Sequence, residues 1–290
     1  MQAVSEAGVR RIYTRTGDDI SHTFPDVLAA MDFEAAIDGE LLVRAPDGGV
    51  APFNELQQRL NRKTVSKKQM DARPAFIRAY DLLVDGDEDL RAQSFKDRRI
   101  RLETFVGGLD TDRIDLSPIV EIESVEALEQ ARNNPLAPEI EGLMLKRWDS
   151  VYEAGRPKGP WFKWKRDPFL IDAVMLYAQR GHGRRSSFYS DFTFGVWREI
   201  DGEDRLTPVG KAYFGFTDDE LKQLDKFVRD NTIERFGPVR SVTATKDKGL
   251  VFEVAFEGLQ RSPRHKSGIA MRFPRINRIR WDKPSAEADR

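Results

Sequence analysis

The spacing of apolar residues divides the chain into two parts with different patterns. In the first 166 residues, short apolar runs alternate with amphipathic segments, which predicts mixed strands and helices. The expected strands are Val9–Thr14, Phe33–Val43, Phe76–Leu83, Ile119–Ile122, Leu143–Arg147 and Trp161–Lys165, and the expected helices are Phe53–Leu60, Phe95–Val106 and Val125–Arg132. Asp38-Gly39 inside the second run indicates a turn or bulge, and the polar stretch Asn61–Arg73 is expected to be exposed.

The pattern changes after Arg166-Asp167-Pro168, because proline disfavours regular structure in the residue before it. Beyond this point the expected strands are Leu170–Gln179, Phe192–Glu199, Lys211–Phe216, Leu250–Phe256 and Met271–Arg280, with one helix at Asp218–Asn231. Short strands with a single helix predict a small closed barrel of the oligonucleotide-binding (OB) type. We therefore expect an α+β protein with domains 1–166 and 167–290, and a disordered tail at Lys283–Arg290.

Composition excludes several classes of site. The chain has 290 residues and no cysteine, so disulfides, thiolate metal sites and cysteine nucleophiles are excluded. Its three histidines, His22, His182 and His265, are too scattered for a metal cluster or a nucleophilic triad. No apolar run approaches the ~20 residues of a membrane span, and the first residues lack the apolar segment of a signal peptide. We expect a cytoplasmic protein with no membrane partner.

The stretch from Glu141 to Lys165 gathers residues suited to a phosphate and a metal ion. Lys163 and Lys165 alternate along one strand and therefore project from the same face. Two neighbouring ammonium groups repel each other unless an anion lies between them, and a phosphate is the simplest such anion. Glu141 allows two interpretations, a solvated salt bridge with Lys146 or a ligand of Mg²⁺.

Other candidates are individually less specific. Glu40 directly follows Asp38-Gly39 and is either an exposed residue at a turn or a functional carboxylate. Tyr80 lies in mid-strand, where it either packs in the core or stacks on a base. The basic segments 180–185, 261–266 and 272–280 are either ordinary barrel loops or contacts for a nucleic-acid backbone, although the formal net charge of the chain is only -1.

Six segments, taken in order, resemble the motifs of ATP-dependent DNA ligases, members of the covalent nucleotidyltransferases. They are YTRTGDDIS, AIDGELLV, FIRAYDLL, EGLMLK, WFKWK and RFPRINRIRWDK, and together they span nearly the whole chain. The resemblance implies a nucleotidyltransferase (adenylation) domain followed by an OB-fold domain. It also implies ATP and Mg²⁺ as cofactors, nicked duplex DNA as the partner, and a monomer.

The resemblance further implies a role for each matching residue. Arg15 would lie near the nucleotide and the nick phosphate, and Tyr80 would stack on adenine. Glu40 would contact the ribose and would help Glu141 to support the metal. Lys163 and Lys165 would bind the AMP phosphate with Arg156 nearby, while Arg275 and Arg280 would orient the pyrophosphate leaving group. We expect the two lysines and the last two arginines to act in catalysis.

One motif of the family is missing from these 290 residues. The family nucleophile is a lysine in the pattern Lys-x-Asp-Gly-x-Arg, shortly before the segment matched by YTRTGDDIS. The Asp-Gly pairs begin at Asp38, Asp47, Asp85 and Asp201, and none has a lysine two residues upstream. The resemblance therefore implies a ligase truncated at its N-terminus, which lacks the lysine that forms the bond to AMP. We expect a defect in self-adenylation, with weak sealing of a pre-adenylated nick retained.

Two alternatives remain open from the sequence. A non-catalytic nucleic-acid-binding fragment would keep the barrel and the basic segments without turnover. An RNA ligase or a capping-type nucleotidyltransferase would share the nucleotide site, but the segment RHKSGIAMRFPRINRIRWDK fits DNA ligases better.

Overall fold

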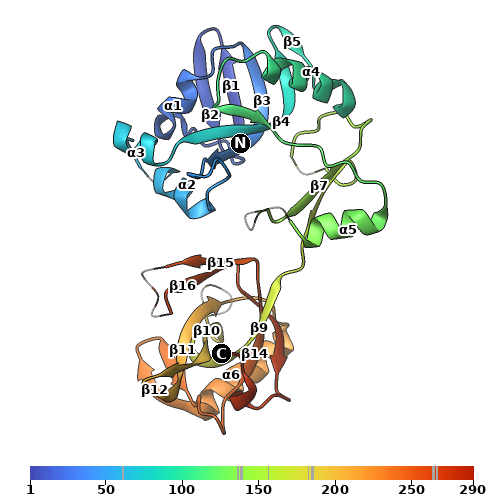
Figure 1. Ribbon diagram of the computed structural model, residues 1–290. Coiled ribbons are helices and arrows are strands. Elements are labelled where there is room, and N and C mark those ends of the chain that lie inside the picture. The colour runs from blue at the N-terminus through green and yellow to red at the C-terminus, as the bar shows by residue number, and fades with distance from the viewer. Residues whose placement is uncertain are drawn as a thin grey trace. The chain divides into compact units, whose positions relative to one another are not determined.

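The computed structural model describes residues 1–60, 62–135, 137, 140–155, 157–181, 183, 186–262, 265 and 267–290 (Figure 1). These residues form two compact units, Met1–Arg166 and Asp167–Arg290. Both units combine strands and helices, which confirms the predicted α+β class. Within the described part of the chain, no helix is long and apolar enough to cross a membrane.

The first unit is built on a six-stranded sheet. Its strands are β1 (Gln2–Glu6), β2 (Val9–Tyr13), β3 (Ala35–Val43), β4 (Ala75–Asp85), β5 (Glu88–Asp89) and β6 (Ile114–Leu116), in the order β2-β1-β3-β4-β5 with β6 parallel to β4. The helices are η1 (Ser21–Thr23), α1 (Pro25–Ala29), α2 (Phe53–Leu60), α3 (Lys67–Ala72), α4 (Phe95–Gly107) and α5 (Val125–Asn133). A separate hairpin pairs β7 (Gly142–Lys146) with β8 (Trp161–Lys165).

Alternating burial explains how the sheet holds its helices. Ile37 and Leu41 on β3 point into the core while Glu40 between them is exposed, as strand geometry requires. Helix α4 contacts β4 and buries Leu102 against it. The helix begins where the Ser94 hydroxyl accepts a hydrogen bond from the amide of Asp97. The sheet and its helices thus form one apolar core in this unit.

The second unit is a barrel-like arrangement of strands with one long helix. Its strands are β9 (Phe169–Arg180), β10 (Tyr189–Ile200), β11 (Glu203–Ala212), β12 (Thr232–Phe236), β13 (Val239–Val242), β14 (Val251–Phe256), β15 (Gly258–Arg261), β16 (Ile269–Arg272) and β17 (Arg275–Arg280), and its helices are α6 (Asp218–Asn231) and η3 (Ser285–Glu287). Strand β9 pairs with β10 along one edge and with both β13 and β14 along the other. This shared strand wraps the sheet around a core that contains Phe192, Phe194 and Phe252.

Several expected elements have the predicted bounds. Helices α2 and α6 match the predicted ranges at both ends, and α6 is closed by a capping box between Thr217 and Glu220. Besides β6 and β11, which are treated below, five strands were not predicted: β1, β5, β12, β13 and β15. They carry few buried apolar residues, so their alternation is weak in the sequence.

The predicted strand at Ile119–Ile122 is wrong. The structure places the strand at β6 instead, and residues 119–122 have no regular structure. Ile119 and Val120 are 45% and 52% exposed, so this apolar run is not buried by any sheet. An apolar run therefore predicts a strand only where a neighbouring strand covers it.

Two further strand predictions need correction in the second unit. Strand β11 ends at Ala212, so the predicted strand Lys211–Phe216 lies mostly outside the sheet. The backbone at Gly215 is also not extended: its φ is +101°, and a Cβ there would lie 1.9 Å from the Ile276 carbonyl oxygen, so only glycine fits. The predicted strand Met271–Arg280 is two strands, β16 and β17, interrupted at Phe273, whose φ is +50°.

The predicted disorder of Lys283–Arg290 is also wrong. Ser285 is 2% exposed, and its carbonyl oxygen accepts a 2.7 Å hydrogen bond from the Trp197 indole nitrogen. The amide of Asp289 donates to the Asp172 carbonyl oxygen at 2.8 Å. A polar composition therefore did not prevent this segment from packing on the strands beside it.

Candidate active site

The hairpin of β7 and β8 brings Glu141, Lys163 and Lys165 together. The Glu141 carboxylate lies 3.4 Å from the Lys163 ammonium and 3.2 Å from the Lys165 ammonium. Gly142 permits this geometry, because its φ is +149° and a Cβ would lie only 2.3 Å from the Trp164 carbonyl oxygen. The anion between the two lysines is therefore a carboxylate of the protein itself.

One carboxylate between two ammonium groups leaves an excess of positive charge. The side chain of Lys163 is 53% exposed, that of Lys165 35% and that of Glu141 23%. Because the group faces solvent, its ion pairs contribute little stability and can be exchanged for other contacts. The arrangement can accept a phosphate, whose oxygens suit charge-assisted hydrogen bonds from lysine.

Lys146 forms no solvated salt bridge with Glu141 in this structure. Its ammonium lies 3.9 Å from the ring centroid of Trp161, 4.4 Å from that of Tyr80 and 4.5 Å from that of Phe95. It also donates to the Tyr80 carbonyl oxygen at 3.4 Å. Burial lowers the pKa of Lys146 to about 8, while the ring faces attract the charged form. Lys146 thus ties the hairpin to β4.

Tyr80 occupies a β-bulge. Asp38 pairs with Asp81 and Gly39 pairs with Ala79, so Tyr80 has no residue opposite it on β3. Gly39 is required there, because a Cβ would lie 2.7 Å from the Ile77 side chain and 2.9 Å from the Arg78 carbonyl oxygen. Burial and the nearby carboxylates raise the pKa of the Tyr80 hydroxyl. The bulge indicated by Asp-Gly is present, and its extra residue lies on β4.

Asp38 connects the bulge to the segment that follows the hairpin's first strand. Its carboxylate accepts hydrogen bonds from the Tyr152 hydroxyl and the Gln2 side-chain amide, both at 3.1 Å. Burial raises the pKa of Asp38 and also raises the pKa of Tyr152 to about 12. The Met1 amino group donates to the Gly39 carbonyl oxygen at 2.9 Å. Sequence reasoning treated Asp38 only as part of a turn.

The charges of Glu40 and Arg15 both act on the Met1 amino group. Burial lowers the pKa of this amino group, while the charges of Asp38 and Glu40 raise it and that of Arg15 lowers it. Glu40 also acts electrostatically on Tyr80. Glu40 is therefore linked electrostatically both to the Met1 amino group, on which Arg15 acts, and to Tyr80 at the bulge.

A buried ion pair lies behind the bulge. Asp81 and Arg98 are both fully buried, and the carboxylate accepts two hydrogen bonds from the guanidinium, at 2.8 and 2.9 Å. Arg98 also donates to the carbonyl oxygens of Gln93 and Ser150. The pair fixes α4 and the segment after β7 onto β4. An aspartate inside the apolar strand FIRAYDLL was the signal for it, because a buried carboxylate needs a partner.

The remaining three predicted residues are not described as part of this group. Arg156 lies outside the described residues. Arg275 and Arg280 belong to the second unit, where Arg275 lies 4.0 Å from Glu257 and Arg280 is hydrogen-bonded to Asp282. Arg280 also contacts the Asp172 carboxylate at 3.4 Å. The charges of these two arginines are thus balanced by carboxylates of their own unit.

The acidic side chains suit a metal site that is completed by phosphate oxygens and water, rather than one that the protein forms alone. In the part of the chain that the structure describes, no three His, Asp or Glu side chains are placed to hold a metal ion. Mg²⁺ commonly takes one or two carboxylates and completes its shell with phosphate oxygens and water. Glu141, beside the ammonium groups of Lys163 and Lys165, fits that donor set.

Comparison with known families assigns the chain. Residues 1–165 match the family model for the ATP dependent DNA ligase domain, and residues 185–283 match that for the ATP dependent DNA ligase C terminal region. The chain belongs to the ATP-dependent DNA ligase family. This DNA ligase family membership confirms the resemblance drawn from the six motifs.

Individual relatives agree with the DNA ligase assignment. The chain is 34% identical to the probable DNA ligase of Koribacter versatilis, over 96% of its own length and 51% of the relative. It is 31% identical to the DNA ligase of Thermococcus fumicolans, over 96% of its length and 49% of the relative. The chain thus spans about half the length of these two ligases.

Solved structures support the fold. The structure named "Pmar-Lig_PreS3" superposes with a TM-score of 0.70 at 15% identity, covering 96% of this chain and 60% of that one. Another, described as "DNA binding with a minimal scaffold: Structure-function analysis of Lig E DNA ligases", gives 0.62 at 19% identity, covering 96% and 88%. The ligase fold is a nucleotidyltransferase (adenylation) domain followed by an OB-fold barrel, as predicted.

Proposed function

We propose that this chain serves ATP-dependent sealing of nicks in duplex DNA, a reaction that proceeds through an enzyme-AMP and a DNA-adenylate intermediate, and that these 290 residues are themselves defective in forming the enzyme-AMP. The observation that carries the proposal is the group of Glu141, Lys163 and Lys165, because it joins a metal-binding carboxylate to two phosphate-binding lysines. Nicked duplex DNA is the partner, ATP and Mg²⁺ are the cofactors, and the chain acts as a monomer.

The residues of the hairpin act on phosphate charge. Lys163 and Lys165 would donate to the AMP phosphate oxygens, and Glu141 would help to hold Mg²⁺. Mg²⁺, when bound, neutralises charge on the phosphate oxygens. Charge that develops as the DNA 3′-hydroxyl displaces AMP is stabilised by the two ammonium groups, because they are positioned before the reaction.

The residues around the bulge hold the nucleoside. Tyr80 stacks on adenine, and Glu40 contacts the ribose and supports the metal. Arg15 lies near the nick phosphate, with Arg156 near the AMP phosphate. Arg275 and Arg280 orient pyrophosphate during attack on ATP, which requires them to leave their carboxylate partners.

Joining of a pre-adenylated nick tests the sealing step. We expect the purified chain to join such a nick, and Lys163→Ala or Lys165→Ala to slow joining about 10²-fold or more, because each removes a donor to the reacting phosphate. Lys96→Ala is the matched control, since Lys96 is an exposed lysine on α4 of the same unit. Equal rates for all three variants would contradict the assignment of the two lysines.

Self-adenylation, the attack of a lysine on ATP, is expected to fail in this chain. The 290 residues contain no Lys-x-Asp-Gly-x-Arg pattern, so we expect no covalent lysine adduct after incubation of this chain with labelled ATP. A labelled protein band would refute this. Salt-dependent binding of nicked duplex without joining in either assay would instead favour a non-catalytic DNA-binding fragment.

A further inference from the structure

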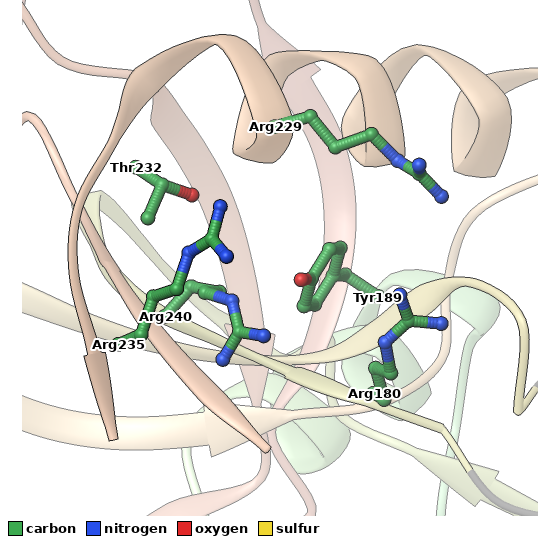
Figure 2. Close-up of a pocket in the computed structure, with 6 residues that line it drawn as sticks. All are labelled: Arg180, Tyr189, Arg229, Thr232, Arg235 and Arg240. Atoms are coloured by element: carbon green, nitrogen blue, oxygen red, sulfur yellow. The ribbon is translucent and has the colours of Figure 1, made fainter. Parts of the chain in front are cut away.

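An arginine-lined cavity lies in the second unit, and none of its lining residues is among those discussed so far as ligands of the nucleotide. Its volume is about 170 Å³, several times the roughly 30 Å³ that one water occupies in the liquid. Its lining, called here the arginine pocket, consists of Arg180, Tyr189, Arg229, Thr232, Arg235 and Arg240 (Figure 2). Four of these six side chains carry a guanidinium.

Strand register builds the pocket from two cross-strand pairs. Arg235 on β12 lies directly opposite Arg240 on β13, and Tyr189 on β10 lies opposite Arg180 on β9. Like charges directly opposite each other destabilise an antiparallel pair. The hairpin of β12 and β13 therefore keeps an arrangement that is unfavourable in the absence of an anion.

Tyr189 is the buried floor of the pocket. Tyr189 is only 4% exposed, whereas Arg180, Arg229 and Arg235 are exposed. The Arg180 guanidinium lies 5.3 Å from the Tyr189 ring centroid and that of Arg240 lies 5.9 Å from it. Figure 2 shows the guanidiniums gathered around this ring. The ring holds two arginines in place by cation–π contact.

The positive charge of the pocket is only slightly offset. Among the described residues, the carboxylate that contacts a pocket guanidinium is that of Asp225, which lies 2.7 Å from Arg229. Arg180 and Arg240 donate to backbone carbonyl oxygens of their own loops, at 3.3 Å to Ser187 and 2.6 Å to Gly237. The lining therefore suits an anion, and arginine forks match phosphate oxygens best.

We propose that the arginine pocket binds one phosphodiester of the duplex DNA backbone. The site is formed entirely by the second unit and fixes the DNA by a contact that carries no sequence information. The choice of DNA rests on the proposed function, whereas the choice of a phosphate rests on the pocket itself.

Salt dependence of binding to nicked duplex tests the proposal. Each phosphate contact contributes about 0.9 to the slope of log K against log salt. Arg235→Ala should therefore reduce the magnitude of this slope by about 0.9. When the salt concentration rises fourfold, the affinity of the wild-type chain for nicked duplex should then fall about 3.5-fold more than the affinity of the variant. Because both arginines serve the same phosphate, Arg240→Ala and the double variant should give nearly the same reduction.

A charge-matched control separates the pocket from general attraction. Arg198 and Arg205 are also cross-strand partners, on β10 and β11, and both are exposed outside the pocket. The double variant Arg198→Ala/Arg205→Ala loses the same charge and should leave the slope nearly unchanged. A loss equal to that of Arg235→Ala/Arg240→Ala, or an unchanged slope in the pocket variants, would overturn the proposal.

Inorganic phosphate provides a second test of the pocket, and this test does not depend on DNA. Phosphate titrated into the wild-type chain should shift the NMR signals of the Arg235 and Arg240 side-chain N–H groups, and Tyr189 should respond with them. The shifts should vanish in the double pocket variant. If the chain binds no DNA but phosphate produces these shifts, the proposed function fails and the pocket stands; if phosphate produces none, the pocket proposal fails by itself.

Discussion

Arginine serves two different purposes in the two units. In the first unit, Arg59 and Arg98 are fully buried, and each is hydrogen-bonded to a carboxylate, Asp26 or Asp81. In the second unit, the arginines of the pocket surround a cavity, with Asp225 as the carboxylate in contact among the residues described there. A buried charge must be paired, whereas exposed charges can be held together for a ligand. Full burial together with a carboxylate partner therefore marks the arginines that support the fold, whereas the arginines that can bind a ligand keep exposed surface.

Removing the partner of a buried arginine should have the largest effect. Asp81→Ala leaves the Arg98 guanidinium buried without its carboxylate, and we expect a loss of about 3–5 kcal/mol in the free energy of unfolding. Urea denaturation followed by circular dichroism measures it. Asp89→Ala removes a carboxylate from the exposed pair with Arg91 and should leave the midpoint within error.

A second variant guards against the possibility that Asp81→Ala fails for packing reasons alone. Asp81→Leu combined with Arg98→Met replaces both charges by apolar side chains, and it should recover much of the stability. If the double variant is as unstable as Asp81→Ala, charge pairing is not the cause of the loss.

Lys146 shows a third arrangement, a cation held by aromatic rings. Its folded pKa of about 8 lies below the usual 10.5, so the unfolded chain binds more protons between these values. The free energy of unfolding should therefore rise with pH across this window. Between pH 7.5 and pH 10, the wild type should gain about 2 kcal/mol relative to Lys146→Met. Parallel pH profiles of the two proteins would show that burial does not disfavour the Lys146 charge.

The smallest expected change in the free energy of unfolding is a stabilisation rather than a loss. Arg235→Thr removes one of two like charges that face each other across β12 and β13. We expect it to stabilise the free chain by about 0.2–1 kcal/mol at low salt, and by less at high salt, where the charges are screened. Thermal unfolding in low-salt and high-salt buffer measures this difference. Destabilisation at low salt would mean that Arg235 is a packing residue rather than part of a ligand site.

Much of the architecture could be predicted because its signals are local. Helix α6 has a capping residue, a regular apolar face and a polar opposite face, so its bounds follow from the sequence. The order of the six motifs was sufficient to identify the family to which the chain belongs. Strand β6 could not be found in this way, because its three residues acquire their role only from the parallel partner β4.

The candidate sites were less accessible to sequence reasoning than the fold. Alternation placed Lys163 and Lys165 on one face, but the anion between them is Glu141, 22 residues before Lys163. Lys146 was interpreted as a salt-bridge residue, because the three rings around it come from separate elements. The arginine pocket depends on the register of β12 with β13, which a sequence does not specify without its partner strand.

The packed C-terminal segment changes how the end of the chain should behave over time. The Asp289 carbonyl oxygen accepts a hydrogen bond from the Trp197 amide on β10, and the Asp289 amide donates to Asp172 on β9. Terminal amides ordinarily exchange with deuterium almost at once, because chain ends fray. Here the amide of Asp289 should exchange slowly, at a rate set by opening of the barrel. The last residues therefore belong to the cooperative unit that unfolds as a whole.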